Sequence, residues 1–152
     1  MRVLLKLTRG RSRVVELGTA TAWTAITFAL DDRRRRVVTY DVIEREEAKR
    51  YLDLVGPDVR ERIELVVAPG CTGPRGQQPV DLLYIDSSHT REHTIAEVRA
   101  WQPYLRSGAP ILFDDYTHPD YPGVREAIEE LGLEGELRGK LFIHRHTNTV
   151  GA

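Results

Sequence analysis

Short apolar runs alternate with longer helical patterns along the chain, and this alternation limits the fold more than any other feature. The apolar runs occupy 14–17, 37–40, 63–67, 80–85, 109–113 and 141–144, and helical patterns occupy 22–30, 44–55, 91–105 and 121–131. Such alternation predicts parallel strands joined by right-handed crossovers, and continuous apolar strands predict a sheet that is covered on both faces. We therefore expect an α/β fold: a Rossmann-like, doubly wound, mostly parallel sheet with helices on both faces.

The length and the charge of the chain indicate one ordinary domain. The 152 residues suffice for one core, so a single domain over 1–152 is predicted. The net charge of −1 favours neither nucleic acid nor a membrane surface as a partner, and the basic run at 33–36 is interpreted as a solvated turn. Cys71 is the only cysteine, and no apolar run approaches the ~20 residues of a membrane span. The expected location is cytoplasmic.

A glycine or an acidic residue follows four of the apolar runs. These residues are Gly18, Asp41, Asp86 and Asp114. Parallel strands end at one edge of their sheet, and ligands of open α/β sheets bind beyond the carboxyl ends of the strands. The four positions are therefore expected to share a ligand-binding edge.

The first two of these strand ends suggest a nucleoside site. Gly18 would allow a tight turn and a close ligand, while the following helix offers a positive N-terminus. Asp41, after the next strand, could accept hydrogen bonds from both hydroxyls of a ribose. An ordinary strand-to-helix turn at Gly18 and a helix cap or loop charge at Asp41 are the alternative interpretations.

The later strand ends suggest a metal site. Asp86, Asp114 and Asp115 would crowd three carboxylates into one small volume, and a hard cation such as Mg²⁺ would relieve their repulsion. His89, three residues after Asp86, is a candidate general base. The alternatives are helix caps and a structural histidine, and His93 is expected to face solvent or the loop.

Several segments together resemble one enzyme family. DLLYIDSSH at 81–89, WQPYLRSG at 101–108, FDDY at 113–116 and DYPGVR at 120–125 carry the likeness. Over 14–131 the chain resembles class I S-adenosylmethionine (SAM)-dependent methyltransferases. It is closest to the metal-dependent O-methyltransferase branch with cephalosporin-hydroxylase-like proteins and macrolide-sugar O-methyltransferases.

The resemblance implies roles for individual residues. Glu16, Gly18 and Thr19 would border the methionine part of SAM, and Asp41 would hold the ribose. On the acceptor side, Asp86, Asp114 and Asp115 would bind Mg²⁺, and His89 would be the base. Asp86 would also border the cofactor. The implied activity is Mg-assisted methyl transfer from SAM to a hydroxyl of a small molecule.

The chain departs from this pattern at three places. Ala22 stands where the family usually has a second glycine, and Ala68, Pro69 and Gly70 follow the third strand, where a polar residue often meets the adenine. Only about a dozen residues precede the first strand, where relatives carry covering helices. A minimal domain, or a site covered by another chain such as the partner in a homodimer, would follow.

Three other functions share parts of this pattern. An NAD(P)-dependent oxidoreductase would share the strand–glycine–helix plan, but the glycine fingerprint here is poor. A degenerate methyltransferase-like binding module would keep the fold without turnover, although the acidic cluster opposes it. A phosphoacceptor domain usually places paired acids after the first strand, where this chain has Gly18.

Overall fold

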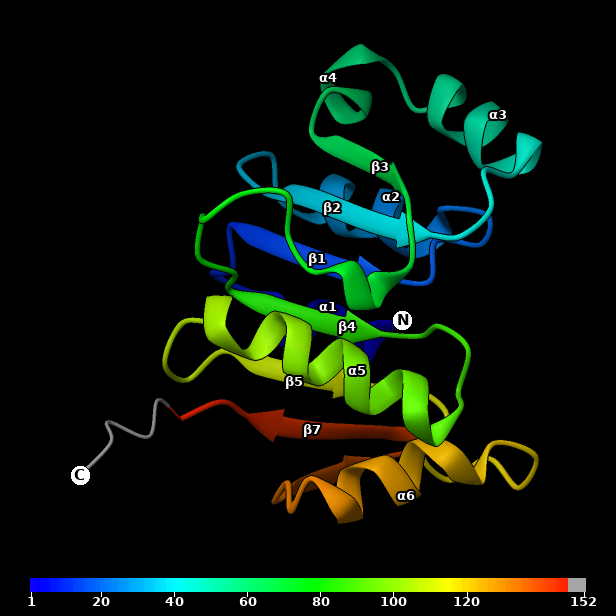
Figure 1. Cartoon of the computed structure of the whole chain (residues 1–152). Coiled ribbons are helices and arrows are strands. Elements are labelled where there is room, and N and C mark those ends of the chain that lie inside the picture. The colour runs from blue at the N-terminus through cyan, green and yellow to red at the C-terminus, as the bar shows by residue number, and fades with distance from the viewer. Residues whose placement is uncertain (148–152) are drawn as a thin grey trace.

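The computed structural model describes residues 1–147, and a seven-stranded sheet forms the centre of this part (Figure 1). The strands follow the order β3-β2-β1-β4-β5-β7-β6. They are β1 (Arg13–Leu17), β2 (Arg36–Asp41), β3 (Ile63–Val67), β4 (Leu82–Ile85), β5 (Pro110–Phe113), β6 (Gly135–Arg138) and β7 (Leu141–Arg145). The first five are parallel, whereas β7 runs antiparallel to both β5 and β6.

Helices cover both faces of the sheet, which confirms the predicted doubly wound fold. They are α1 (Arg2–Leu7), α2 (Trp23–Asp31), α3 (Glu46–Leu54), α4 (Pro57–Arg60), α5 (Arg91–Trp101) and α6 (Pro122–Glu130), with short 3₁₀ turns η1 (Gly70–Thr72) and η2 (Gln102–Tyr104). Figure 1 shows α5 and α6 on one face of the sheet and α1 and α2 on the other.

Alternate residues of each strand feed two separate cores, because successive side chains of a strand point to opposite faces. Val14 packs with the side of the sheet that faces α1 to α4, and Val15 packs with the side that faces α5 and α6. Both side chains are at most 1% exposed. The apolar character of the runs, without polar alternation, thus reflects burial on two faces.

Helices α1 and α4 and strand β6 were not foreseen in the sequence, and one helix was predicted to be longer than it is. Helix α1 is short and only Leu4 is buried in it, while β6 is exposed along its length and so carries no apolar run. The helix expected over 91–105 ends at Trp101 and continues as η2, which contains Pro103. Proline lacks the N–H that a continuing helix would need.

The interpretation of 33–36 as a solvated turn is wrong at one residue, since Arg35 is fully buried. Its Nη1 donates a hydrogen bond to the carbonyl oxygen of Phe28 at 2.7 Å, and its Nη2 donates to that of Thr8 at 2.7 Å. Nη1 also lies 3.1 Å from the Asp31 carboxylate. A guanidinium can satisfy several carbonyls at once, so this side chain ties the end of α1 to α2.

The register of the parallel strands brings the predicted ligand positions to one edge. Leu17 is aligned with Tyr40 of β2 and with Ile85 of β4, and Ile85 is aligned with Phe113 of β5. Gly18, Asp86 and Asp114 therefore follow at neighbouring strand ends, with Asp41 closing β2 beside them. Within the described residues, no helix has the length and apolar character needed to cross a membrane.

Candidate active site

The turn after β1 brings the backbones of two strand ends into contact. Gly18 has φ +103°, and its amide donates to the Tyr40 carbonyl at 2.8 Å. A Cβ at this position would lie 1.9 Å from the carbonyl oxygen of Asp86, so a residue with a side chain does not fit. Glycine is required here both for the backbone angle and for the close approach.

The Asp41 carboxylate organises the loops that follow β1 and β2. Its Oδ2 accepts a hydrogen bond from the Ala20 amide at 2.9 Å, and its Oδ1 accepts one from the Ile43 amide at 3.2 Å. Each carboxylate oxygen has more than one lone pair, so further donors can still be accepted. Asp41 is part of the lining of the pocket described below.

Glu16 and Thr19 lie buried behind the Gly18 turn. Thr39 donates to Glu16 Oε2 at 2.6 Å, and the hydroxyls of Thr39 and Thr19 are 2.7 Å apart. Burial raises the pKa of Glu16 to about 8, more than the Thr39 hydrogen bond lowers it. Neither Glu16 nor Thr19 lines the pocket, so they form a polar layer beneath it.

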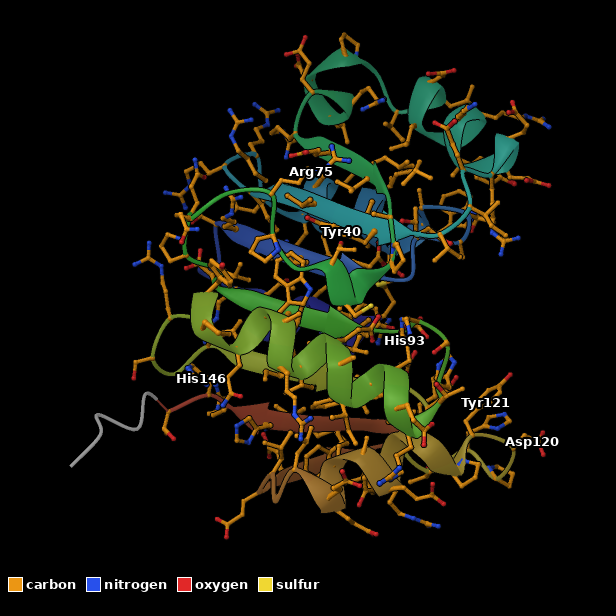
Figure 2. All side chains as sticks on the ribbon, in the orientation of Figure 1. Tyr40, Arg75, His93, Asp120, Tyr121 and His146 are labelled. Carbon is orange, nitrogen blue, oxygen red and sulfur yellow. The ribbon has the colours of Figure 1, made fainter. Side chains whose placement is uncertain are left out.

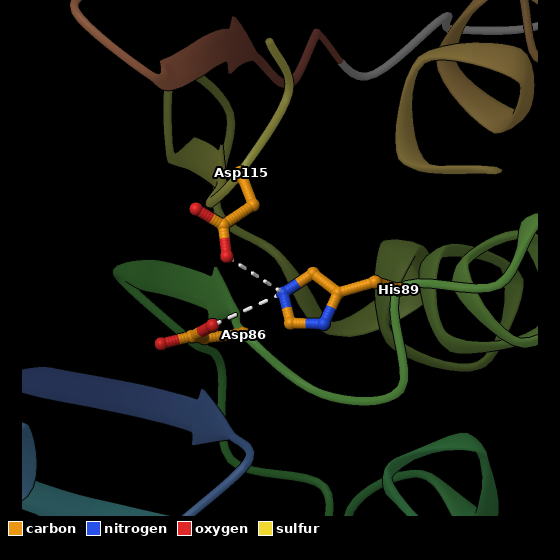
Figure 3. Close-up of side chains that lie close together, drawn as sticks. All are labelled: Asp86, His89 and Asp115. Carbon is orange, nitrogen blue, oxygen red and sulfur yellow. Dashed lines mark ion pairs between the residues drawn. The ribbon is translucent and has the colours of Figure 1, made fainter. Parts of the chain in front are cut away.

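Asp86, His89 and Asp115 converge in one small cluster (Figure 3). The His89 Nε2 atom lies 3.2 Å from Asp86 Oδ1 and 3.5 Å from Asp115 Oδ2, and one ligand atom from each residue fits within 4.8 Å of the others. Neither contact has hydrogen-bond geometry, so Nε2 is buried without a hydrogen-bond partner. The Asp86 carboxylate raises the pKa of His89 above its ordinary value.

Asp114 lies beside this cluster rather than within it. Its Oδ2 accepts a 2.8 Å hydrogen bond from the Tyr84 hydroxyl, which also donates to Asp86 Oδ2 at 3.1 Å. The Lys140 ammonium, between β6 and β7, lies 3.2 Å from Asp114 Oδ2 and 2.8 Å from Asp115 Oδ1. The sequence predicted the carboxylates, but it gave no signal for Lys140.

Aromatic stacking and close backbone packing hold His89. Its ring stacks on Tyr121 with a centroid distance of 4.5 Å, and Tyr121 stacks in turn on His118 at 4.5 Å. A Cβ on Gly123, at the start of α6, would lie 2.7 Å from the His89 carbonyl oxygen. The PG pair at 122–123 therefore lets α6 approach the His89 loop closely.

A pocket of about 270 Å³ opens beside the cluster, at the carboxyl edge of the sheet. Its lining comes from the ends of β1, β2 and β4 with the loops after them, from η1 and from α5: Gly18, Ala20, Tyr40, Asp41, Val42, Arg45, Gly70, Asp86, Ser87, Ser88, His93 and Glu97. Asp86 belongs to both the pocket and the cluster.

His93 and Glu97 line this pocket, and sequence reasoning missed both roles. His93 was expected to face solvent or the loop, but its Nε2 lies 3.1 Å from Glu97 Oε1. Figure 2 shows His93 at the same edge of the sheet as Tyr121, with His146 at the opposite edge. The four-residue spacing, which places both side chains on one helix face, was the available signal.

We compared the chain with protein-family models, curated proteins and solved structures. Residues 15–116 match a family model described as a methyltransferase domain, and no curated protein matches the sequence. CalS11, a TDP-rhamnose 3'-O-methyltransferase of calicheamicin biosynthesis, is 21% identical with a TM-score of 0.76, over 95% of this chain and 76% of that chain. An O-methyltransferase family protein from Burkholderia thailandensis is 12% identical with a TM-score of 0.71, over 97% and 56% of the two chains.

A third solved structure was determined with the cofactor. TomG is an O-methyltransferase from Streptomyces achromogenes involved in tomaymycin synthesis, solved in complex with SAM; it is 23% identical with a TM-score of 0.66, over 95% of this chain and 77% of that one. These likenesses show the fold, and the family match extends from β1 to just beyond β5. It therefore includes the Gly18 turn, Asp41 and the Asp86–His89–Asp115 cluster. The chain belongs to the methyltransferase domain family, as a SAM-dependent methyltransferase of the class I fold.

Proposed function

We propose that this methyltransferase transfers the methyl group of SAM to a hydroxyl oxygen of a small molecule, assisted by a divalent cation, Mg²⁺ by preference. One observation carries the proposal: Asp86 lines the pocket and also belongs to the cluster with His89 and Asp115. A methyl donor in the pocket and a hydroxyl at the cluster would meet beside this one side chain. Bringing the two reactants together supplies much of the rate enhancement in such a transfer.

The pocket residues would divide the cofactor between them. Gly18 lines the pocket, and its backbone would border the methionine part, above the polar layer of Glu16 and Thr19. Asp41 is held by the amides of Ala20 and Ile43 and would accept the ribose hydroxyls. Asp86 would border the reacting end.

The donor set of the cluster fits a hard divalent cation. Asp86 and Asp115 offer carboxylate oxygens, the ligands that Mg²⁺ prefers, and these lie within 4.8 Å of each other. The buried Nε2 of His89 has no hydrogen-bond partner, so it would be able to accept a proton from a group bound beside the cation. Asp114 is the third proposed ligand, because the Tyr84 hydroxyl joins its Oδ2 to that of Asp86. A bound cation would lower the pKa of an acceptor hydroxyl.

His89 would complete the chemistry as the general base. Its Nε2 would take the proton of the acceptor hydroxyl, and the oxygen would form a bond to the methyl carbon as the carbon–sulfur bond breaks. The products are the methyl ether and S-adenosylhomocysteine (SAH). The Tyr121 ring, stacked on His89, would hold the imidazole plane during proton transfer.

Calorimetric titration tests the cofactor site. The wild-type chain is titrated with SAM and SAH in Mg²⁺ and in EDTA, beside Asp41→Ala and the exposed control Asp53→Ala. We expect micromolar binding that weakens more than about tenfold in Asp41→Ala, since a charge-assisted pair of hydrogen bonds is lost. Absence of binding to the wild type in every condition would overturn the proposed activity.

Two further variants test the cluster. Asp115→Asn should weaken Mg²⁺ binding, measured by calorimetry. His89→Gln should keep Mg²⁺ binding and lose methyl transfer to a hydroxylated acceptor. Loss of Mg²⁺ binding in His89→Gln would make the imidazole a ligand and overturn its role as the base, while SAM binding with no turnover on any acceptor would favour a degenerate module.

We also propose a small-molecule acceptor, rather than nucleic acid or a membrane, and a homodimer as the assembly of a single 1–152 domain. Val42 and Ile43 support a covered pocket mouth, because both are more than half exposed directly after Asp41. An acceptor or a second copy would remove this apolar surface from water. Light scattering, with and without SAH, measures the assembly.

A further inference from the structure

Glu97 is a buried carboxylate that neither the cation cluster nor the chemistry of methyl transfer uses. It stands on α5 with no exposed surface, and it lines the pocket together with His93 one turn earlier. Burying a carboxylate costs several kcal/mol unless its oxygens are well partnered. Its presence at the pocket therefore calls for a group that it binds.

Only one oxygen of this carboxylate has a proper hydrogen bond. Oε2 accepts from the Ser87 hydroxyl at 2.8 Å. Oε1 lies 3.1 Å from His93 Nε2, without hydrogen-bond geometry, and has no hydrogen-bond partner although it is buried. Oε1 is thus a hydrogen-bond acceptor at the pocket wall that can still accept a hydrogen bond from a ligand.

The opposite wall is shaped around this free oxygen. A Cβ on Gly70 would lie 2.5 Å from Glu97 Oε1, so only a glycine leaves the carboxylate in place. The Gly70 carbonyl accepts a 2.7 Å hydrogen bond from Trp101 Nε1, which holds η1 against α5. Two segments far apart in sequence are therefore fixed on either side of the same oxygen.

The position of Glu97 indicates which part of a ligand it meets. On the proposed function, on which this inference rests, the reacting end lies at Asp86 and the ribose at Asp41. The polar groups left in the lining on the α5 side are those of Ser87, Ser88, His93 and Glu97. The part of SAM left over is the adenine, whose exocyclic amino group is a hydrogen-bond donor.

We propose that Glu97 recognises the adenine of the cofactor, with Oε1 accepting a hydrogen bond from the exocyclic amino group. His93 is a positioning residue, because its Nε2 contacts the same oxygen and its ring closes that side of the pocket. The three residues directly after β3, Ala68, Pro69 and Gly70, offer no polar side chain for the base, and α5 supplies one across from Gly70. A carboxylate here also selects against bases that present a carbonyl oxygen at this position.

The test compares two ligands that differ at this one group. SAH carries the amino group, whereas S-inosylhomocysteine carries a carbonyl oxygen in its place. Both are titrated calorimetrically into the wild type, Glu97→Gln and the control Glu92→Gln, whose side chain on the same helix is 77% exposed. We expect the wild type and the control to prefer SAH by about tenfold or more, as for a lost charge-assisted hydrogen bond.

In Glu97→Gln the ratio of the affinities for SAH and S-inosylhomocysteine should fall towards one or reverse, because the carboxamide can donate a hydrogen bond to the carbonyl oxygen of the inosine base. His93→Ala, at a half-buried position that leaves the core intact, should lower the preference in the same direction. An unchanged preference in both variants, with SAH still bound, would overturn the role of Glu97 alone. Failure of the wild type to bind either ligand would instead overturn the proposed function, and this inference with it.

Discussion

Replacing Gly18 by alanine tests how the β1 and β4 ends are joined. The new Cβ would lie 1.9 Å from the Asp86 carbonyl oxygen and 2.6 Å from its carbonyl carbon. These are backbone atoms held in the sheet, since the Asp86 amide donates to the Leu17 carbonyl at 2.8 Å. No side-chain rotation can relieve the contact, so one strand end must move.

Two costs add in this variant. A positive φ costs a residue with a Cβ ~1–2 kcal/mol, and forcing an extra carbon into a packed site costs ~1–3 kcal/mol. Gly18→Ala should therefore lower the free energy of unfolding by about 2–5 kcal/mol. A domain of ordinary stability, ~5–15 kcal/mol, would remain folded at 25 °C.

Gly132→Ala is the matched control, because Gly132 also has a positive φ, of +62°, but open space where its Cβ would stand. It should lose only the ~1–2 kcal/mol of the backbone angle. Urea unfolding followed by circular dichroism measures both variants. Equal losses for the two variants would refute the steric reasoning, and the Gly18 turn would then be less tightly packed than described.

Three further predictions concern burial and charge. Burial raises the pKa of Glu16 from 4.5 to about 8, so between these values Glu16 holds a proton in the folded chain that the unfolded chain has released. The urea midpoint of unfolding should therefore fall as pH rises from about 5 to 8. In Glu16→Gln this fall should be smaller. A midpoint that rises over this range would contradict the assignment. Arg35→Met should lower the free energy of unfolding by ~2–4 kcal/mol, because it leaves buried carbonyl groups without a hydrogen-bond partner. The control Arg34→Met, at an exposed position, should lower it by less than ~0.5 kcal/mol. Similar losses in the two variants would count against the role of the buried Arg35 hydrogen bonds. Lys140→Met should tighten Mg²⁺ binding up to about tenfold in calorimetry, since its ammonium lies 2.8 Å from Asp115 Oδ1; an unchanged affinity would show that the lysine does not compete.

The sequence sufficed for six of the seven strands, because apolar runs mark the buried ones, and for much of the candidate site, because its residues follow the ends of those strands. An apolar strand in a parallel sheet must end at the common edge, so residues directly after it are placed without knowledge of side-chain packing. Gly18, Asp41 and Asp86 were located in this way. The gathering of Asp86 with His89 followed from their three-residue spacing, although the position of Asp114 beside the cluster did not.

Side chains that arrive from other elements escaped sequence reasoning. Glu97 reaches the pocket from the middle of α5, where an acidic residue ordinarily faces solvent. Lys140 arrives on the hairpin of β6 and β7, and β6 has no apolar run to announce it. Arg35 was lost in a basic run, because nothing in four consecutive arginines shows which one faces the carbonyls of α1 and α2.

The pairing of β1 with both β2 and β4 has an evolutionary consequence. The chain first winds outward from β1 to β3 and then returns to wind outward from β4, so the residues of the candidate site come from two consecutive halves of the polypeptide. Gly18 and Asp41 come from the first half, and Asp86, His89 and Asp115 come from the second. Because Asp86 and Glu97 of the second half line the same pocket as Gly18 and Asp41 of the first half, recombination at the 73–79 loop could exchange one half only if its pocket wall matched that of the other.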